Sequence, residues 1–139
     1  MANEPLHEVF DLTDPDNNTL FGMTVEEARA HVSNGDAEAV GRIRGAFALV
    51  GREGHRVRLA RSLSVPLRTF IAKRTAGPAL IVAHRMATIR EWLEAHGYGD
   101  QFHPSYTRMV PAHHVTEIAL LGRPDPSPSH RRFLTPEAN

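Results

Sequence analysis

The sequence predicts a mixed α+β domain in which helices pack on a mainly antiparallel sheet. Three observations support this class. Short apolar or alternating segments follow one another through the middle of the chain, a helical period takes over later, and glycine and proline mark the boundaries. A length of 139 residues suits one domain that buries a core without disulfides or a structural metal.

The N-terminal part predicts one strand and two helices. Residues 7–12 form the strand, which ends in a dense cluster of turn-forming residues. Thr24 and Glu27 have the spacing of a capping box, so the first helix begins there. Gly35 supplies a left-handed exit from that helix, and Asp36 can cap a second, short helix.

The middle of the chain predicts a hairpin and two further strands. Residues 46–50 and 55–60 flank the hairpin turn at residues 51–54. Residues 70–72 give the next strand, and residues 79–83 give another. The last of these is apolar throughout, which suits burial on both faces.

The C-terminal part predicts one helix, one strand and a tail. Apolar residues share one helical face in residues 85–96, and residues 115–121 form the last strand. Four prolines follow and imply an extended segment without regular structure. We therefore expect a single domain over residues 1–122 and a proline-rich extended tail over residues 123–139.

Composition limits the possible functions. Sixteen basic and sixteen acidic residues cancel, so we expect no nucleic-acid partner and no membrane partner. The absence of cysteine excludes disulfides, thiolate zinc sites and thiol nucleophiles. We expect no cofactor. The first residues contain neither a basic segment nor an apolar run, which predicts a cytoplasmic protein.

Histidines are the candidate metal ligands, namely His103, His113 and His114, with His130 further along the chain. Adjacent residues in an extended segment point to opposite faces, so His113 and His114 would share one ion only in a distorted turn. No recognisable ligand motif accompanies them. We therefore predict no metal site, with one histidine buried and hydrogen-bonded and one solvated.

Arginines recur near the hairpin, at positions 56, 58, 61 and 68. They could bind a phosphate or a carboxylate through bidentate contacts. The simpler interpretation is a solvated sheet face, because Arg56, Arg58 and Arg61 alternate with Val57 and Leu59 and predict one wet and one buried face.

Several short motifs, taken in order, resemble one protein family. They are residues 44–50 (RGAFALV), 57–62 (VRLARS), 66–67 (PL), 83–84 (AH) with the helix after them, 106–115 (YTRMVPAHHV) and 132–136 (RFLTP). This succession is similar to the N-terminal glutamine-amidotransferase domain of class B asparagine synthetases and related proteins. The resemblance implies a truncated layered fold of the N-terminal-nucleophile (Ntn) hydrolase type.

The resemblance also implies a lost activity. Members of this family hydrolyse glutamine with an N-terminal cysteine. In this sequence Ala2 follows Met1, and the family's stretches that hold glutamine are missing. The ATP-binding loop of the synthetase domain is missing as well. We therefore expect no glutaminase activity by the cysteine mechanism, no catalytic residues, and no catalytic activity of the chain by itself.

The favoured hypothesis is a noncatalytic accessory domain that partners a separately encoded, asparagine-synthetase-like, ATP-dependent amide-bond-forming enzyme. In the family such a tail continues into the synthetase, which suggests docking. Residues 106–111 mix aromatic, cationic and apolar side chains, as interfaces do. The candidate partner or ligand contacts are Arg61, Tyr106, Arg108, His113 and His114.

Two alternatives remain open. The chain could be a small stand-alone enzyme or ligand-binding protein whose pocket is lined by Arg61, Arg108, His113 and His114. It could also be a degenerate relic or a fragment that self-associates through exposed sheet edges.

Overall fold

The computed structural model describes residues 8–54, 56–75, 78–119 and 128–133. Three helices are described, α1 (Val25–Ser33), α2 (Ala37–Gly41) and α3 (Met86–Ala95), with 3-10 turns at Pro15–Asn17, Gly99–Gln101 and Pro104–Tyr106. The strands are β1 (Val9–Asp11), β2 (Thr19–Phe21), β3 (Arg44–Ala46), β4 (Ala48–Glu53), β5 (Arg56–Arg61), β6 (Arg68–Ala72), β7 (Ala79–Ala83), β8 (Arg108–Met109), β9 (His114–Ala119) and β10 (Ser129–Arg132). The predicted α+β class is confirmed.

The strands form two four-stranded sheets and a small ribbon. The first sheet has the order β10-β9-β5-β4 and is antiparallel throughout. The second has the order β1-β7-β6-β8, in which β1 runs parallel to β7 and the other pairs are antiparallel. β2 and β3 pair separately as an antiparallel ribbon.

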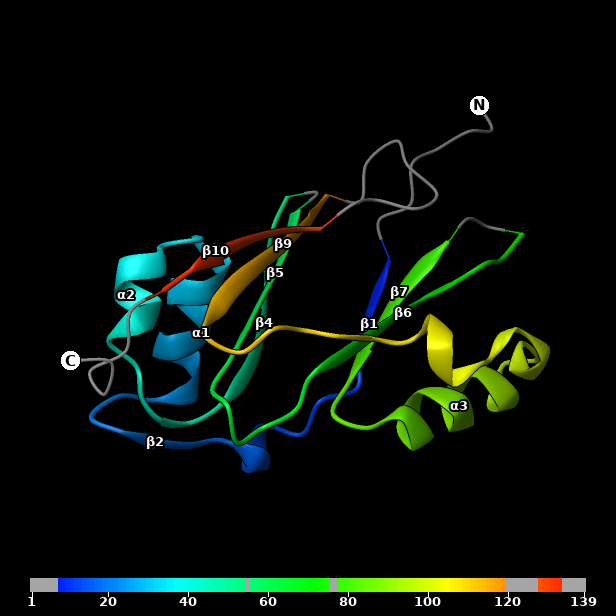
Figure 1. Ribbon diagram of the computed structural model, residues 1–139, viewed down its shortest axis with the longest axis horizontal. Coiled ribbons are helices and arrows are strands. Elements are labelled where there is room, and N and C mark those ends of the chain that lie inside the picture. The colour runs from blue at the N-terminus through cyan, green and yellow to red at the C-terminus, as the bar shows by residue number, and fades with distance from the viewer. Residues whose placement is uncertain (1–7, 55, 76–77, 120–127, 134–139) are drawn as a thin grey trace.

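The two large sheets pack face to face between outer helices, so the domain has four layers (Figure 1). Helices α1 and α2 cover the outer face of the first sheet, and α3 covers that of the second. β7 illustrates the layering: Leu80 and Val82 enter the core between the sheets, while Ile81 packs under α3 with Ile89. Successive strand residues point to opposite faces, which is why this strand is apolar throughout.

Local predictions at the helix ends are confirmed. The Thr24 hydroxyl accepts a hydrogen bond from the Glu27 amide (3.1 Å), and the Glu27 carboxylate accepts one from the Thr24 amide (2.8 Å). Gly35 has a φ of 68°. Asp36 accepts a hydrogen bond from the Ala39 amide (3.1 Å) at the start of α2. These devices need only neighbouring residues, because helix ends leave backbone groups unsatisfied.

Three predictions require correction. β4 continues through Glu53, which pairs with Arg56, so the hairpin turn is later and tighter than residues 51–54. The tail is not devoid of regular structure, because β10 pairs with β9. The predicted wet face of β5 is wrong: Arg58 and Arg61 are 7% and 9% exposed. Helix α1 covers one face of this strand and the second sheet covers the other.

The predicted strand of residues 115–121 is confirmed up to Ala119, and residues 120 and 121 lie outside the described part of the chain. Among the described residues, no helix has the length and apolar character needed to cross a bilayer.

Candidate functional site

The candidate site lies around residues 110–113, which cross from β8 in one sheet to β9 in the other. Val110 is buried between the sheets, and its amide donates to the Leu67 carbonyl (2.8 Å). The His113 amide donates to the Arg61 carbonyl (3.1 Å). The predicted contact residues Arg61, His113 and His114 are thus brought to one crossover, whose backbone is tied to both sheets.

Arg61 holds this crossover through backbone oxygens. Its Nε donates to the Val110 carbonyl at 2.6 Å. Its Nη1 lies 3.3, 3.2 and 3.4 Å from the carbonyl oxygens of Ser62, Leu63 and Val65. Because Arg61 projects toward the inter-sheet core and its Nε and Nη1 donate to backbone carbonyls, these groups shape the loop and are not directed at a ligand.

The charge of Arg61 is poorly compensated. Burial lowers its pKa, and the positive charge of Arg68 lowers it further. In the described part of the chain, no carboxylate forms an ion pair with it. Carbonyl dipoles therefore provide most of its stabilisation.

His113 occupies a strained position beside the crossover. Its φ is 64°, a left-handed conformation that is uncommon outside glycine. Its ring meets the edge of Phe133 at a centroid distance of 6.1 Å, and its carbonyl accepts from the Phe133 amide (2.9 Å). The buried Nδ1 has no hydrogen-bond partner among the described residues. His113 thus joins the end of β10 to the sheet.

His114 lies near His130 on the same face of the first sheet. The two rings are 6.4 Å apart between centroids and nearly perpendicular. His114 Nδ1 is 2.8 Å from the Ala112 carbonyl, so this nitrogen carries the hydrogen. His130 Nδ1 is 2.8 Å from the Thr116 hydroxyl. These contacts orient both rings.

The three candidate metal ligands do not converge. His103 caps the 3-10 turn Pro104–Tyr106, where its Nδ1 contacts the Ser105 hydroxyl (2.7 Å). Within the described ranges, no group of three or more histidine, aspartate or glutamate residues is placed to hold one ion. The metal-ligand set of His103, His113 and His114 is therefore not assembled.

Tyr106 and Arg108 are accessible, in contrast to Arg61. Tyr106 is 65% exposed and Met109 is 42% exposed, and Arg108 is exposed between them. β8 pairs with β6 through Arg68 and Thr69, and no described strand pairs with its other side. We call Tyr106, Arg108 and Met109 the β8 patch.

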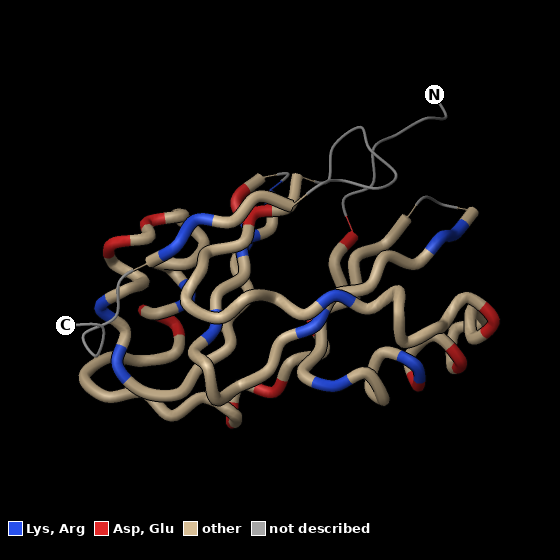
Figure 2. The backbone as a smooth tube through the Cα atoms, in the orientation of Figure 1, with Lys and Arg blue, Asp and Glu red and all other residues tan. Residues whose placement is uncertain are grey.

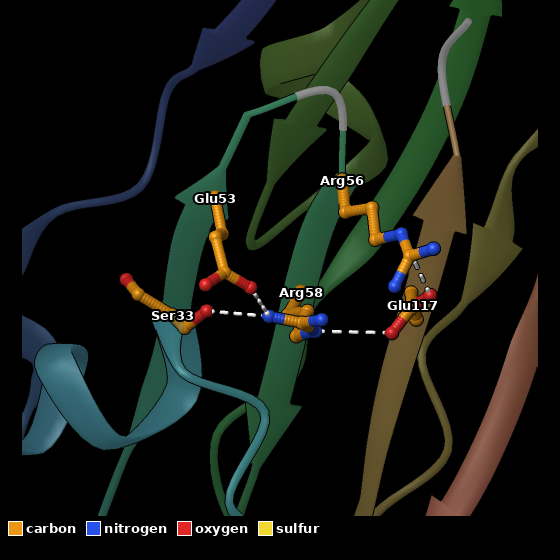
Figure 3. Close-up of polar contacts among 5 residues, drawn as sticks. All are labelled: Ser33, Glu53, Arg56, Arg58 and Glu117. Atoms are coloured by element: carbon orange, nitrogen blue, oxygen red, sulfur yellow. Dashed lines mark hydrogen bonds and ion pairs between the residues drawn. The ribbon is translucent and has the colours of Figure 1, made fainter.

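A network around Arg58 was not predicted (Figure 3). Arg58 Nη1 lies 2.7 Å from a Glu53 carboxylate oxygen and 2.6 Å from the Ser33 carbonyl. Its Nε donates to Glu117 at 3.0 Å, and Arg56 reaches the other oxygen of that carboxylate at 3.6 Å. The network joins the end of α1 to β4, β5 and β9.

This network is structural in character. Hydrogen bonding to Glu53 raises the pKa of Arg58 above its ordinary value, and Glu117 adds to this against the opposing effect of burial. Gly35 leaves room for the guanidinium, since a Cβ there would lie 2.8 Å from it. The alternation of arginines was visible in the sequence, but the carboxylates that face them depend on strand register and sheet order.

Comparison with known proteins gives no identification: no protein-family model, no curated protein and no solved structure matches this chain.

Proposed function

We propose that this protein is a noncatalytic accessory domain, of truncated Ntn-hydrolase-like fold, that binds a separately encoded asparagine-synthetase-like enzyme forming amide bonds with ATP. Two antiparallel-rich sheets between outer helices support the layered fold that the sequence resemblance implies. The 139 residues contain no cysteine, so the thiol chemistry of that family has no nucleophile here.

The β8 patch is the observation that carries the proposal. Large apolar side chains usually lie in the core, and a cluster of an aromatic, an arginine and a methionine is typical of protein interfaces. Tyr106, Arg108 and Met109 have this composition along a sheet edge, where Tyr106 is largely open to solvent and Met109 is partly so. Arg108 and Met109 are adjacent in β8 and therefore lie on opposite faces of this edge. A partner that covers the patch would bury apolar area and could use the guanidinium of Arg108 for a charged contact.

The crossover gives less support to the alternative of a ligand pocket. Arg61 is committed to backbone carbonyls, and the Nδ1 atoms of His114 and His130 already have partners. A pocket that used Arg61 or the Nδ1 of His114 would require these groups to release the crossover, although the buried Nδ1 of His113 has no partner among the described residues and Arg108 is exposed. Partner binding at the β8 patch requires no such change.

Co-purification with a synthetase-type enzyme that has the ATP loop but no amidotransferase domain tests the proposal. We expect association at micromolar concentrations and a loss of about tenfold or more in affinity for the double variant Tyr106→Ala/Met109→Ala, because central apolar residues dominate interface energies. The matched control is Phe21→Ala/Leu63→Ala, which removes exposed apolar side chains elsewhere. The proposal fails if the wild-type protein does not bind, or if both variants bind equally well.

A glutaminase assay provides a second test. The purified protein should release no glutamate or ammonia from glutamine, and the synthetase-type partner should retain its synthetase activity in the complex. Glutamine hydrolysis by material free of contaminating enzymes would contradict the noncatalytic assignment.

A further inference from the structure

Strand β10 is an exposed edge of the first sheet. It pairs with β9 from Ser129 opposite Glu117 to Arg132 opposite His114. All four residues of β10 are exposed, and within the described ranges no strand pairs with its other side. Such an edge presents backbone donors and acceptors that another extended segment can use.

The outward backbone groups belong to His130 and Arg132. The Phe133 amide donates to the His113 carbonyl, which is directly opposite in the register of β9 and β10. Hydrogen-bonded and non-hydrogen-bonded pairs alternate along an antiparallel ladder. Arg131 and Ser129 therefore direct their backbone groups toward β9, whereas those of His130 and Arg132 point away from the sheet.

The edge is basic. Arg131 and Arg132 are adjacent, so their side chains lie on opposite faces, with His130 on the same face as Arg132. The arginines of β10 are coloured blue in Figure 2. In the part of the chain that the structure describes, no carboxylate pairs with either arginine. Glu117, the acidic residue of β9, is instead engaged by Arg58 and Arg56.

We propose that the β10 edge binds an extended, acidic segment of a partner protein as an additional strand. Main-chain hydrogen bonds to His130 and Arg132 would supply the affinity. Carboxylates on alternate residues would share one face of the added strand and lie beside Arg132 and His130, or beside Arg131 if the register shifts by one residue. Charge complementarity favours this occupant over a second copy, because two β10 edges would bring their arginines together. The proposal goes beyond the accessory function and holds whatever enzyme the β8 patch contacts.

The probe is a short fluorescent peptide in which glutamate alternates with valine, and its anisotropy is measured with the full-length protein. We expect micromolar binding, with shifts of the His130 and Arg132 amide signals in nitrogen-15 NMR spectra. Replacing each glutamate by lysine, or methylating the peptide's backbone nitrogens, should remove binding. Equal binding of the glutamate and lysine peptides would overturn the proposal.

The variant His130→Pro tests the strand mode directly. Proline removes the outward amide without removing a bond to β9, and proline is tolerated on an edge strand where its nitrogen faces solvent. His130→Ala is the matched control, since both variants lose the contact with Thr116. We expect His130→Pro to lower the affinity for the peptide by about tenfold relative to His130→Ala. The variant loses one hydrogen bond from the backbone amide, and the proline ring occupies space next to the peptide backbone. Equal affinities for the two variants would overturn the strand mode.

Charge reversal keeps the proposal testable if the proline variant fails to fold. The double variant Arg131→Glu/Arg132→Glu should no longer bind the glutamate peptide and should bind the lysine peptide, because the charge of the edge is reversed. Both positions are exposed, so the substitutions should leave the fold intact. Sedimentation of the unliganded protein provides the last check. Concentration-dependent dimers that His130→Pro abolishes would assign the edge to a second copy and overturn the acidic-partner proposal.

Discussion

The two faces of β5 each bury an arginine, and the two arginines are satisfied in different ways. Arg58 lies under α1 and reaches two carboxylates and a carbonyl. Arg61 points between the sheets and reaches carbonyl oxygens. The pKa of Arg58 is raised and that of Arg61 is lowered, because full negative charges compensate burial better than dipoles do. The face of β5 under α1 thus carries an ion-pair network, and the face toward the second sheet carries the arginine that anchors the crossover.

Arg61→Ala should have the largest effect on stability. The substitution leaves the Val110 carbonyl and its neighbours without donors at the crossover, so we expect a loss of roughly 3 kcal/mol in the free energy of unfolding. Urea denaturation followed by circular dichroism measures this loss. Arg61→Lys should recover only part of it, because an ammonium cannot reach the same set of oxygens. A loss below about 1 kcal/mol for Arg61→Ala would contradict the anchoring role.

Glu117→Ala should follow, with a loss of about 2 kcal/mol, because it leaves the buried Arg58 without its less exposed partner. Glu53→Ala removes the more exposed partner and should cost less than about 1 kcal/mol. The same urea titrations, repeated at high salt, rank the two carboxylates. A larger effect for Glu53→Ala would reverse the proposed order.

Gly35→Ala examines the space that Arg58 needs. The new methyl group would lie 2.8 Å from the guanidinium at a φ of 68°, so we expect a loss of about 1.5 to 2 kcal/mol. Gly54→Ala is the matched control, with a φ of 60° and open space around the added atom, and should lose about 1 kcal/mol or less. In an Arg58→Ala background, the stability losses of Gly35→Ala and Gly54→Ala should become equal, as measured by thermal unfolding. If Gly35→Ala still lost more stability than Gly54→Ala, the Arg58 side chain would not be the cause of the difference.

Glu38→Gln should have the smallest effect. Glu38 and Arg42 form an exposed ion pair one helical turn apart, at 3.3 Å. Such pairs contribute at most about 0.5 kcal/mol, so the unfolding midpoint in urea should hardly change. A change as large as that of Glu117→Ala would mean that burial is not what separates the Arg58 network from ordinary surface pairs.

Local chemistry accounts for the successful sequence predictions. Thr24 with Glu27, Asp36, and the apolar run of β7 each specify an element through neighbours along the chain. The failures at Arg58, Arg61 and β10 share a different cause. Each depends on which segment covers a strand face or pairs with an edge, and alternation along one strand cannot reveal whether water or a helix lies above it.

Of the candidate contacts, the composition of residues 106–111 indicated an interface, and Tyr106 and Arg108 are exposed as such a role requires. Arg61 was a reasonable candidate because arginine often binds anions, but the crossover occupies it. Strand β10 was not predicted from the sequence, because the prolines of this segment indicated a tail without regular structure. Proline restricts its own backbone, yet the residues after it remain free to pair with a sheet.

The amino-acid sequence by itself determined the helix starts, the most buried strand, the α+β class and the lack of a thiol nucleophile, because each follows from residue identity and short-range spacing. Only the tertiary structure decided that both faces of β5 are covered, that Arg58 meets Glu53 and Glu117, and that β10 ends the sheet with basic residues. Those outcomes arise when segments distant in the chain exclude water from one another, and the energy of a charge depends on the partners that replace that water.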